Sequence, residues 1–210
     1  MTILLQDDFN DNSLDLAKWT LNDPTDDFSE TNNQAEFFLN TVNEPEIDLT
    51  SIVSVSSGKF TMQAFFSTSS PLSASTPSRL NLYDNFQTLG LVLRYETGTF
   101  FVVGFGETGI PSPKDVKIEY DYATDVADYY YWDGNSWINM ASVTGNFVPT
   151  NAKLLITATF AGTENVTAIA DNVFFTDNFY TTHYPISEAE RKIQKTVQIR
   201  RGVKTVVQTQ

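Results

Sequence analysis

The chain has 210 residues, no cysteine, 41% hydrophobic residues and a formal charge of −13. It is long enough to bury a core as one all-β domain, and the missing cysteines exclude disulfides, thiolate zinc sites and cysteine nucleophiles. The acidic balance repels phosphate groups, so neither nucleic acid nor a membrane is an expected partner. The N-terminus lacks the pattern of a signal peptide, which predicts synthesis in the cytoplasm.

Apolar side chains alternate with polar ones along most of residues 1–186, which predicts one antiparallel sandwich of ten to twelve strands. Alternating apolar sets occur at Phe60–Phe66, Val116–Tyr122 and Leu154–Phe160. Between Tyr129–Trp132 and the segment that follows, Asp133-Gly134 is a strong signal for a short hairpin turn. Residues 1–186 are therefore expected to form a single β-sandwich domain.

The pattern changes after Pro185. Ser187 and Glu190 have the spacing of a capping box, which predicts a short helix, and the β-prone segments Thr196–Arg200 and Val203–Gln208 follow it. Residues 1–187 carry seven Lys and Arg against 24 Asp and Glu, whereas residues 188–210 carry six against two.

So short a segment cannot hold a core alone. Residues 187–210 are therefore expected to be a basic arm that docks, by strand addition, on its own domain or on another protein subunit. The expected docking residues are Arg191, Lys192, Lys195, Arg200, Arg201 and Lys204.

Two segments resemble the concanavalin A-like lectin/glucanase superfamily. Asp7–Trp19, with its acidic-Phe start and Lys-Trp end, resembles the first strand and loop of these domains, and Val166–Phe175 resembles their last strand. Between them, Val116–Tyr120 and Tyr129–Gly134 resemble the strands that lead to a hairpin. The resemblance covers about residues 3–180. It implies a two-sheet jelly roll with paired first and last strands, but it does not choose among lectins, glycosidases and non-catalytic modules of adhesins and phage particles.

One strand resembles half of a glycosidase site. Laminarinase-type members of the superfamily carry their two catalytic carboxylates in a strand of the pattern Glu-x-Asp-x-(x)-Glu. Here Glu46 and Asp48 supply the first half, while Thr50 and Ser51 stand where the second glutamate would be. Hydrolysis is therefore not expected.

Two further motifs are also incomplete. Gly104–Gly109 matches a dinucleotide fingerprint, but Pro111 and Pro113 prevent the helix that must follow, so a glycine-rich turn is expected. His183 is the single histidine, and the Gly-x-Ser-x-Gly sequence of a serine hydrolase does not accompany it. We therefore expect a non-enzyme that requires no cofactor.

The aromatic run before Asp133-Gly134 has the composition of a sugar site. Alternation sends Tyr129 and Tyr131 to one face of the strand and the next aromatic pair to the other, so one pair is expected in the core and the other exposed. The candidate carbohydrate-binding residues are Tyr130, Trp132, Asp133 and Asn135. The alternative is that these aromatic residues only stabilise the sheet as cross-strand pairs.

The resemblance also implies a structural calcium ion between the first and last strands. Asp8 together with Asp171 or Asp177 would hold it, and the alternative is a set of acid-rich turns without a metal.

Two functions remain open from the sequence. In the first, the protein is a non-catalytic structural or adhesion subunit of a large assembly, such as the decoration, fibre or tail of a phage virion, with residues 187–210 as its anchor. In the second, it is a stand-alone carbohydrate-binding module. The two are compatible, because a displayed subunit can bind surface glycans, and a glycoside hydrolase ranks third.

Overall fold

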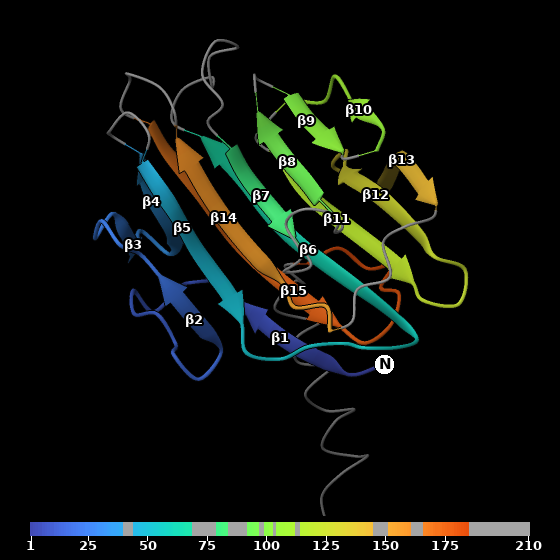
Figure 1. The fold of residues 1–210 in the computed structure, drawn as a ribbon, viewed down its shortest axis with the longest axis horizontal. Helices are drawn as coiled ribbons and strands as arrows, with labels where there is room; N and C mark the ends of the chain where they lie inside the picture. The colour runs from blue at the N-terminus through green and yellow to red at the C-terminus, as the bar shows by residue number, and fades with distance from the viewer. Residues whose placement is uncertain are drawn as a thin grey trace, which may run out of the picture.

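The computed structural model describes residues 1–39, 44–68, 79–83, 92–96, 99–102, 104–111, 114–144, 151–160 and 166–184. These residues form fifteen strands and no helix, arranged as two antiparallel sheets that face each other (Figure 1). The predicted all-β sandwich is confirmed. The predicted number of ten to twelve strands is too low, because several strands of two to four residues are too short to show an alternating pattern.

Sheet A has eight strands, in the order β13-β12-β11-β6-β15-β4-β3, with β1 also paired to β15. Its strands are β1 (Ile3–Asp7), β3 (Phe28–Thr31), β4 (Gln34–Leu39), β6 (Lys59–Thr68), β11 (Lys114–Asp121), β12 (Val126–Trp132), β13 (Trp137–Thr144) and β15 (Val166–Thr176).

Sheet B has seven strands, in the order β10-β9-β8-β7-β14-β5-β2. Its strands are β2 (Trp19–Asn22), β5 (Glu44–Ser51), β7 (Arg79–Tyr83), β8 (Val92–Glu96), β9 (Thr99–Val102), β10 (Gly106–Glu107) and β14 (Leu155–Phe160).

The hydrophobic core lies between the two sheets, as the alternation predicts. Successive side chains of a strand point to opposite faces, so every second residue of a strand points into this core. Each large apolar side chain buried in this way contributes about 1.5–3 kcal/mol. The fully buried residues from the predicted alternating sets are Phe60, Met62, Ala64, Phe66, Val116, Ile118, Tyr120, Leu154, Ile156 and Ala158.

The first and last strands pair side by side, as the resemblance implied. β1 runs antiparallel to β15, with Asp7 opposite Val173. The carboxylate of Asp7 accepts a hydrogen bond of 2.7 Å from the indole N–H of Trp19 and one of 3.1 Å from the backbone N–H of Phe9. The Phe9 ring stacks on Trp19 with centroids 5.9 Å apart. The acidic-Phe and Lys-Trp parts of the opening motif are therefore joined by a buried polar contact.

The Asp133-Gly134 turn and the glycine-rich turn are both found where they were predicted. Residues 133–136 connect β12 to β13, and Gly134 takes a φ of +106°, which favours glycine. Gly104–Gly109 lies around β10 and contains no helix.

The predicted helix from Ser187 and the basic arm 187–210 lie outside the described residues, and so does the boundary between residues 186 and 187. No helix of the described part is long and apolar enough to cross a membrane.

Candidate functional site

Residues 177–184 continue from β15 and cross the outer face of sheet A, which is the face turned away from the core. In Figure 1 this orange-red segment passes behind β6 and β11. Thr61 of β6 accepts a hydrogen bond from the backbone N–H of Tyr180 and donates one to the carbonyl of Asn178, both at 3.0 Å. Gln63 bonds to both backbone groups of Tyr184. Polar side chains of β6 thus hold the segment against the sheet.

A small second core fixes the same segment. Phe174 of β15 is buried against Tyr180 and Tyr184, with ring centroids 4.5 and 5.5 Å away. The hydroxyl of Tyr184 accepts a hydrogen bond of 3.2 Å from the side chain of Gln6. Residues 177–184 are therefore part of the folded domain.

A pocket of about 350 Å³ lies on this outer face, between the β12–β13 hairpin and Thr181 of the crossing segment. Three aromatic side chains, three amide or hydroxyl side chains and one ion pair form its walls. The lining residues are Lys117, Glu119, Tyr130, Trp132, Asn135, Ser136, Trp137 and Thr181.

The ion pair at the pocket is almost completely buried. Nζ of Lys117 donates to Oε1 of Glu119 at 2.7 Å and to the carbonyl of Tyr180 at 3.1 Å. The ammonium group also lies 4.5 Å from the ring centre of Tyr130 and 4.8 Å from that of Trp137. Burial lowers the pKa of Lys117, although Glu119 opposes this change. Because the two charges offset each other inside an aromatic wall, the pocket has little net charge of its own.

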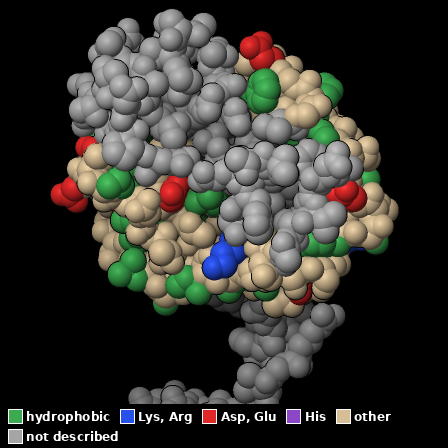
Figure 2. Space-filling view, viewed as in Figure 1, with side chains coloured by type: hydrophobic (Ala, Val, Ile, Leu, Met, Phe, Trp, Pro, Cys, Tyr) green, Lys and Arg blue, Asp and Glu red, His purple; other side chains and the backbone are tan. Residues whose placement is uncertain are grey.

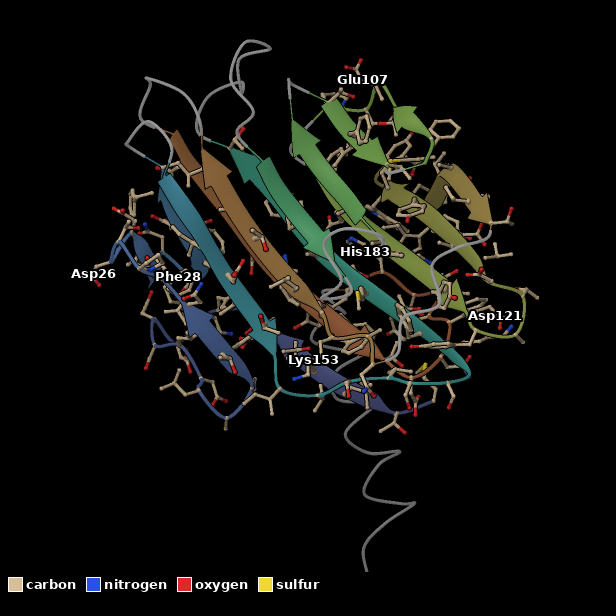
Figure 3. All side chains as sticks on the ribbon, in the orientation of Figure 1. Asp26, Phe28, Glu107, Asp121, Lys153 and His183 are labelled. Atoms are coloured by element: carbon tan, nitrogen blue, oxygen red, sulfur yellow. The ribbon has the colours of Figure 1, made fainter. Side chains whose placement is uncertain are left out.

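The aromatic side chains of the hairpin pack against one another. Trp132 and Trp137, which are opposite each other on β12 and β13, form an edge-to-face pair with centroids 5.4 Å apart. His183 of the crossing segment stacks on Trp132, and Figure 3 labels this histidine. Burial, together with the nearby carboxylates of Glu119 and Asp128, raises the pKa of Tyr130 to about 12, so its hydroxyl keeps its proton.

Three of the four predicted carbohydrate-binding residues line this pocket. Tyr130 and Trp132 point away from the core, whereas Tyr129 is fully buried in it, so the exposed pair is the second one. Asn135 also borders the pocket. Asp133 is not among the described lining residues. Its carboxylate accepts 2.8 Å hydrogen bonds from the backbone N–H groups of Asn135 and Ser136 within the turn. These bonds lower the pKa of Asp133.

The sequence interpretation missed Lys117, Glu119, Ser136, Trp137 and Thr181. Lys117 and Glu119 alternate with the core residues of β11, so the strand pattern places them on the outer face. Their place beside the aromatic hairpin depends on the register, which sets Lys117 opposite Tyr130. In the sequence, a lysine in the middle of an alternating apolar strand was the available signal for a polar site on the outer face. Its position beside the hairpin follows only from the strand register.

Two of the three calcium candidates lie at the paired first and last strands: Asp8 directly follows β1, and Asp171 belongs to β15. Burial raises the pKa of Asp171 to about 6, and the charge of Asp8 adds to this effect, so the two carboxylates are near each other. Asp177 accepts a hydrogen bond from the backbone N–H of Thr2 instead. In the described ranges, no three Asp, Glu or His side chains are grouped so that they could hold a metal ion. The described part therefore supplies no cluster of three such side chains, and the calcium ion stays a prediction.

The incomplete glycosidase strand is β5, in sheet B. Asp48 accepts a hydrogen bond of 2.9 Å from the hydroxyl of Thr157 and one of 3.4 Å from the amide of Asn22. The side chain of Glu46 lies outside the described part. Asp48 is thus bound to a hydroxyl and an amide of neighbouring strands.

Comparisons with protein-family models and with curated protein sequences give no match. Comparison with solved structures gives matches. The chain is similar to the exoplasmic/lumenal domain of VIP36 in its Ca²⁺/Man₃GlcNAc-bound form, with a TM-score of 0.58 and 11% identity over 86% of this chain and 93% of that chain.

Two further similar structures come from different kinds of protein. Arcelin-5, a lectin-like defence protein of Phaseolus vulgaris, gives a TM-score of 0.55 and 12% identity over 78% of this chain and 94% of that one. The other structure is described with endo-acting O-glycanases of the human gut microbiota that initiate mucin breakdown. It gives a TM-score of 0.60 and 9% identity over 87% of this chain and 100% of that one. Identities this low establish architecture only. With its two antiparallel sheets and its paired first and last strands, the chain has the jelly-roll fold of the concanavalin A-like lectins and glucanases.

Proposed function

We propose that the protein binds carbohydrate without cleaving it, and that the pocket beside the β12–β13 hairpin is the binding site. The observation that carries this proposal is a pocket bordered by three aromatic and three amide or hydroxyl side chains: Tyr130, Trp132, Trp137, Asn135, Ser136 and Thr181. Aromatic surface covers the C–H groups of a pyranose ring, and a few placed polar groups bond its hydroxyls and fix its orientation.

The carboxylate content of the described pocket lining favours binding without cleavage. Hydrolysis of a glycosidic bond requires two carboxyl groups that flank it. Among the described residues that line the pocket, Glu119 is the only carboxylate, and it is bound to Lys117 at 2.7 Å. A carboxylate held in this way is poorly placed to act as an acid or as a nucleophile.

The structural neighbours give independent support. One neighbour is a complex with Man₃GlcNAc and another is a lectin-like protein, although a third is described with glycanases. The fold is thus found in a protein with a bound glycan and in proteins described with glycan cleavage, so the fold supports a carbohydrate ligand and the residues of the site must decide whether it is cleaved.

A glycan array tests the proposal. We expect the intact protein to bind at least one class of glycan, and Trp132→Ala to lose that binding while it keeps its β-sheet circular dichroism. Phe105→Ala is the matched control, because Phe105 is 57% exposed and does not border the pocket. Equal binding by both variants would remove the hairpin pocket from consideration.

A second function is favoured by the distribution of charge. We propose that the domain is displayed by an assembly, such as a virion, and anchored to other subunits through residues 187–210. This segment has an excess of basic residues, whereas residues 1–187 carry a formal charge of −17. On the face shown in Figure 2, acidic side chains lie at several separate places and basic ones at one. Opposite charges of this size steer association between subunits.

Deletion of residues 187–210 tests the anchoring role. We expect the truncated protein to leave its native oligomer or particle, as measured by light scattering or by sedimentation with the particle. It should keep the fold, because Tyr180 and Tyr184, which hold the crossing segment, remain. A truncated protein that stays in its assembly would contradict this role.

A further inference from the structure

The edge of sheet A at β13 is a long strand without charged residues. It reads Trp-Ile-Asn-Met-Ala-Ser-Val-Thr from Trp137 to Thr144, with no Lys, Arg, Asp, Glu or Pro. No described strand pairs with its outer edge. An edge strand presents unpaired N–H and C=O groups, and proteins usually protect such edges with charges, prolines, bulges or short strands. β13 has one such protection, a register shift between Tyr129 and Tyr130 of its partner β12.

The other edges of the two sheets are better protected. β3 and β2 have four residues each, and β10 has two. β1, for which β15 is the one described partner, has five residues and ends with the charged Asp7. β3 also contains Glu30, which is buried. Beyond the register shift, Ala141–Thr144 of β13 pairs regularly with β12. β13 is therefore the described edge that is best suited to accept another strand.

The surroundings of β13 favour a basic partner. Asp128 of β12 lies directly opposite Ser142, and Asp133 lies in the turn that leads into β13. Neither carboxylate forms an ion pair with any Lys or Arg of the described part. Asp128 accepts a hydrogen bond from the Ser142 hydroxyl and also attracts the Lys117 ammonium, but Lys117 is already bound to Glu119. An incoming strand that carries positive charges would therefore meet an excess of negative charge near this edge.

One segment of the chain has the required composition. Val203–Gln208 reads Val-Lys-Thr-Val-Val-Gln, which is rich in β-branched residues, and Arg200 and Arg201 come just before it. We infer that Val203–Gln208 binds to the outer edge of β13 as an added strand. This inference names the acceptor for the anchoring role proposed above, on which it rests, and it does not depend on sugar binding.

The chain contains no cysteine, so thiol cross-linking can test this pairing without background. Thr144→Cys marks the β13 edge, Thr205→Cys marks the added strand, and a short bis-maleimide joins them. Thr31→Cys, on the exposed edge strand β3, is the matched control. We expect the Thr144/Thr205 pair to cross-link with at least a tenfold higher yield than the Thr31/Thr205 pair. High salt should lower the yield of the Thr144/Thr205 pair, because it screens the attraction between opposite charges. Equal yields, or none, would overturn the inference.

A mixture of the two single variants Thr144→Cys and Thr205→Cys separates this inference from the anchoring role. A cross-linked dimer in the mixture supports both. A cross-link that forms only within the double variant supports the pairing with β13 but contradicts anchoring between copies. No cross-link, together with loss of the oligomer on deletion of residues 187–210, leaves anchoring standing and overturns the choice of β13.

Hydrogen exchange gives a second measurement that requires no cysteine. We expect the amides of Ala141–Thr144 to exchange at least tenfold faster after deletion of residues 187–210, because the added strand would bond their outer N–H groups. Unchanged exchange at β13 would overturn the inference.

Discussion

The imidazole of His183 lies flat against the indole of Trp132, with ring centroids 4.3 Å apart and ring planes inclined by 12°. Nε2 of His183 lies 3.1 Å from a carboxylate oxygen of Asp115 but is not aligned for a hydrogen bond. Strand β11, the β12–β13 hairpin and residues 177–184 together form the pocket, and the His183–Trp132 stack joins the last two.

The first prediction concerns this stack. His183 does not itself border the pocket, so its effect on a ligand would act through the position of Trp132. We expect His183→Ala to weaken glycan binding about two- to tenfold, the value of one aromatic pair. His183→Phe should retain most of the affinity, because it keeps the stack. Titration calorimetry with a glycan from the array would measure both, and equal losses in the two variants would contradict a positioning role.

The buried Lys117–Glu119 pair leads to the second prediction. Removal of one partner leaves a buried charge alone, so Lys117→Met and Glu119→Gln should each cost about 3–5 kcal/mol of unfolding free energy. The double variant should cost less than the sum of the two. Urea unfolding would measure these values.

Lys59→Met is the matched control for this cycle, because Lys59 pairs with Asp121 while 44% exposed. Its cost should stay below about 1 kcal/mol. Strict additivity in the Lys117–Glu119 cycle would show that the two side chains do not act as a pair.

The third prediction concerns Asp171. Burial raises the pKa of this carboxyl from 3.8 to about 6. The protonated form therefore contributes its full stabilisation below about pH 4, and this contribution is lost as the pH rises through 6. Asp171→Asn should therefore stabilise the protein at pH 7.5, on the order of 1 kcal/mol because solvent screens the partly exposed group. At pH 3.5 the gain should disappear.

The same variant tests the calcium hypothesis. If Asp8 and Asp171 held calcium, millimolar Ca²⁺ would raise the melting temperature of the intact protein, and Asp171→Asn would abolish that rise. If they do not, Ca²⁺ has no effect on the melting temperature, and the variant is the more stable protein at neutral pH because the buried carboxylate is gone.

A fourth prediction concerns the opening motif. In Asp7→Asn the amide cannot accept from both the Trp19 indole and the Phe9 backbone N–H, so one buried donor loses its acceptor. The expected cost is about 1–3 kcal/mol, measured by thermal unfolding. Asp26→Asn is the control, because Asp26 is exposed and its positive φ of 61° suits asparagine. A similar small effect in both variants would contradict a structural role for the motif.

Much of the fold could be predicted from local patterns. The alternation at Phe60–Phe66 identifies the buried face of β6, Asp133-Gly134 identifies the hairpin, and the alternation at Tyr129–Trp132 separates a core pair from an outer pair. These features depend on neighbouring residues only, so a single sequence is enough to find them.

The pocket could be predicted only in part, because it depends on contacts between distant segments. Thr181 reaches it because Thr61 and Gln63 hold residues 177–184 across sheet A, and no sequence pattern marks that crossing. Asp133 has the right composition for a sugar contact, but the turn uses its carboxylate. The aromatic and polar composition of the hairpin indicates the site. Which residues line the pocket depends on the strand register and on hydrogen bonds between distant segments.

The most direct test of carbohydrate binding uses the three tryptophans of the chain. Trp132 and Trp137 border the pocket, whereas Trp19 is buried beside Asp7 and serves as an internal control. In a ¹H–¹⁵N spectrum titrated with a glycan from the array, we predict saturable shifts of the Trp132 and Trp137 indole signals, with the Trp19 signal unchanged. Binding that leaves both pocket indoles unmoved, or shifts all three equally, would contradict the proposed site.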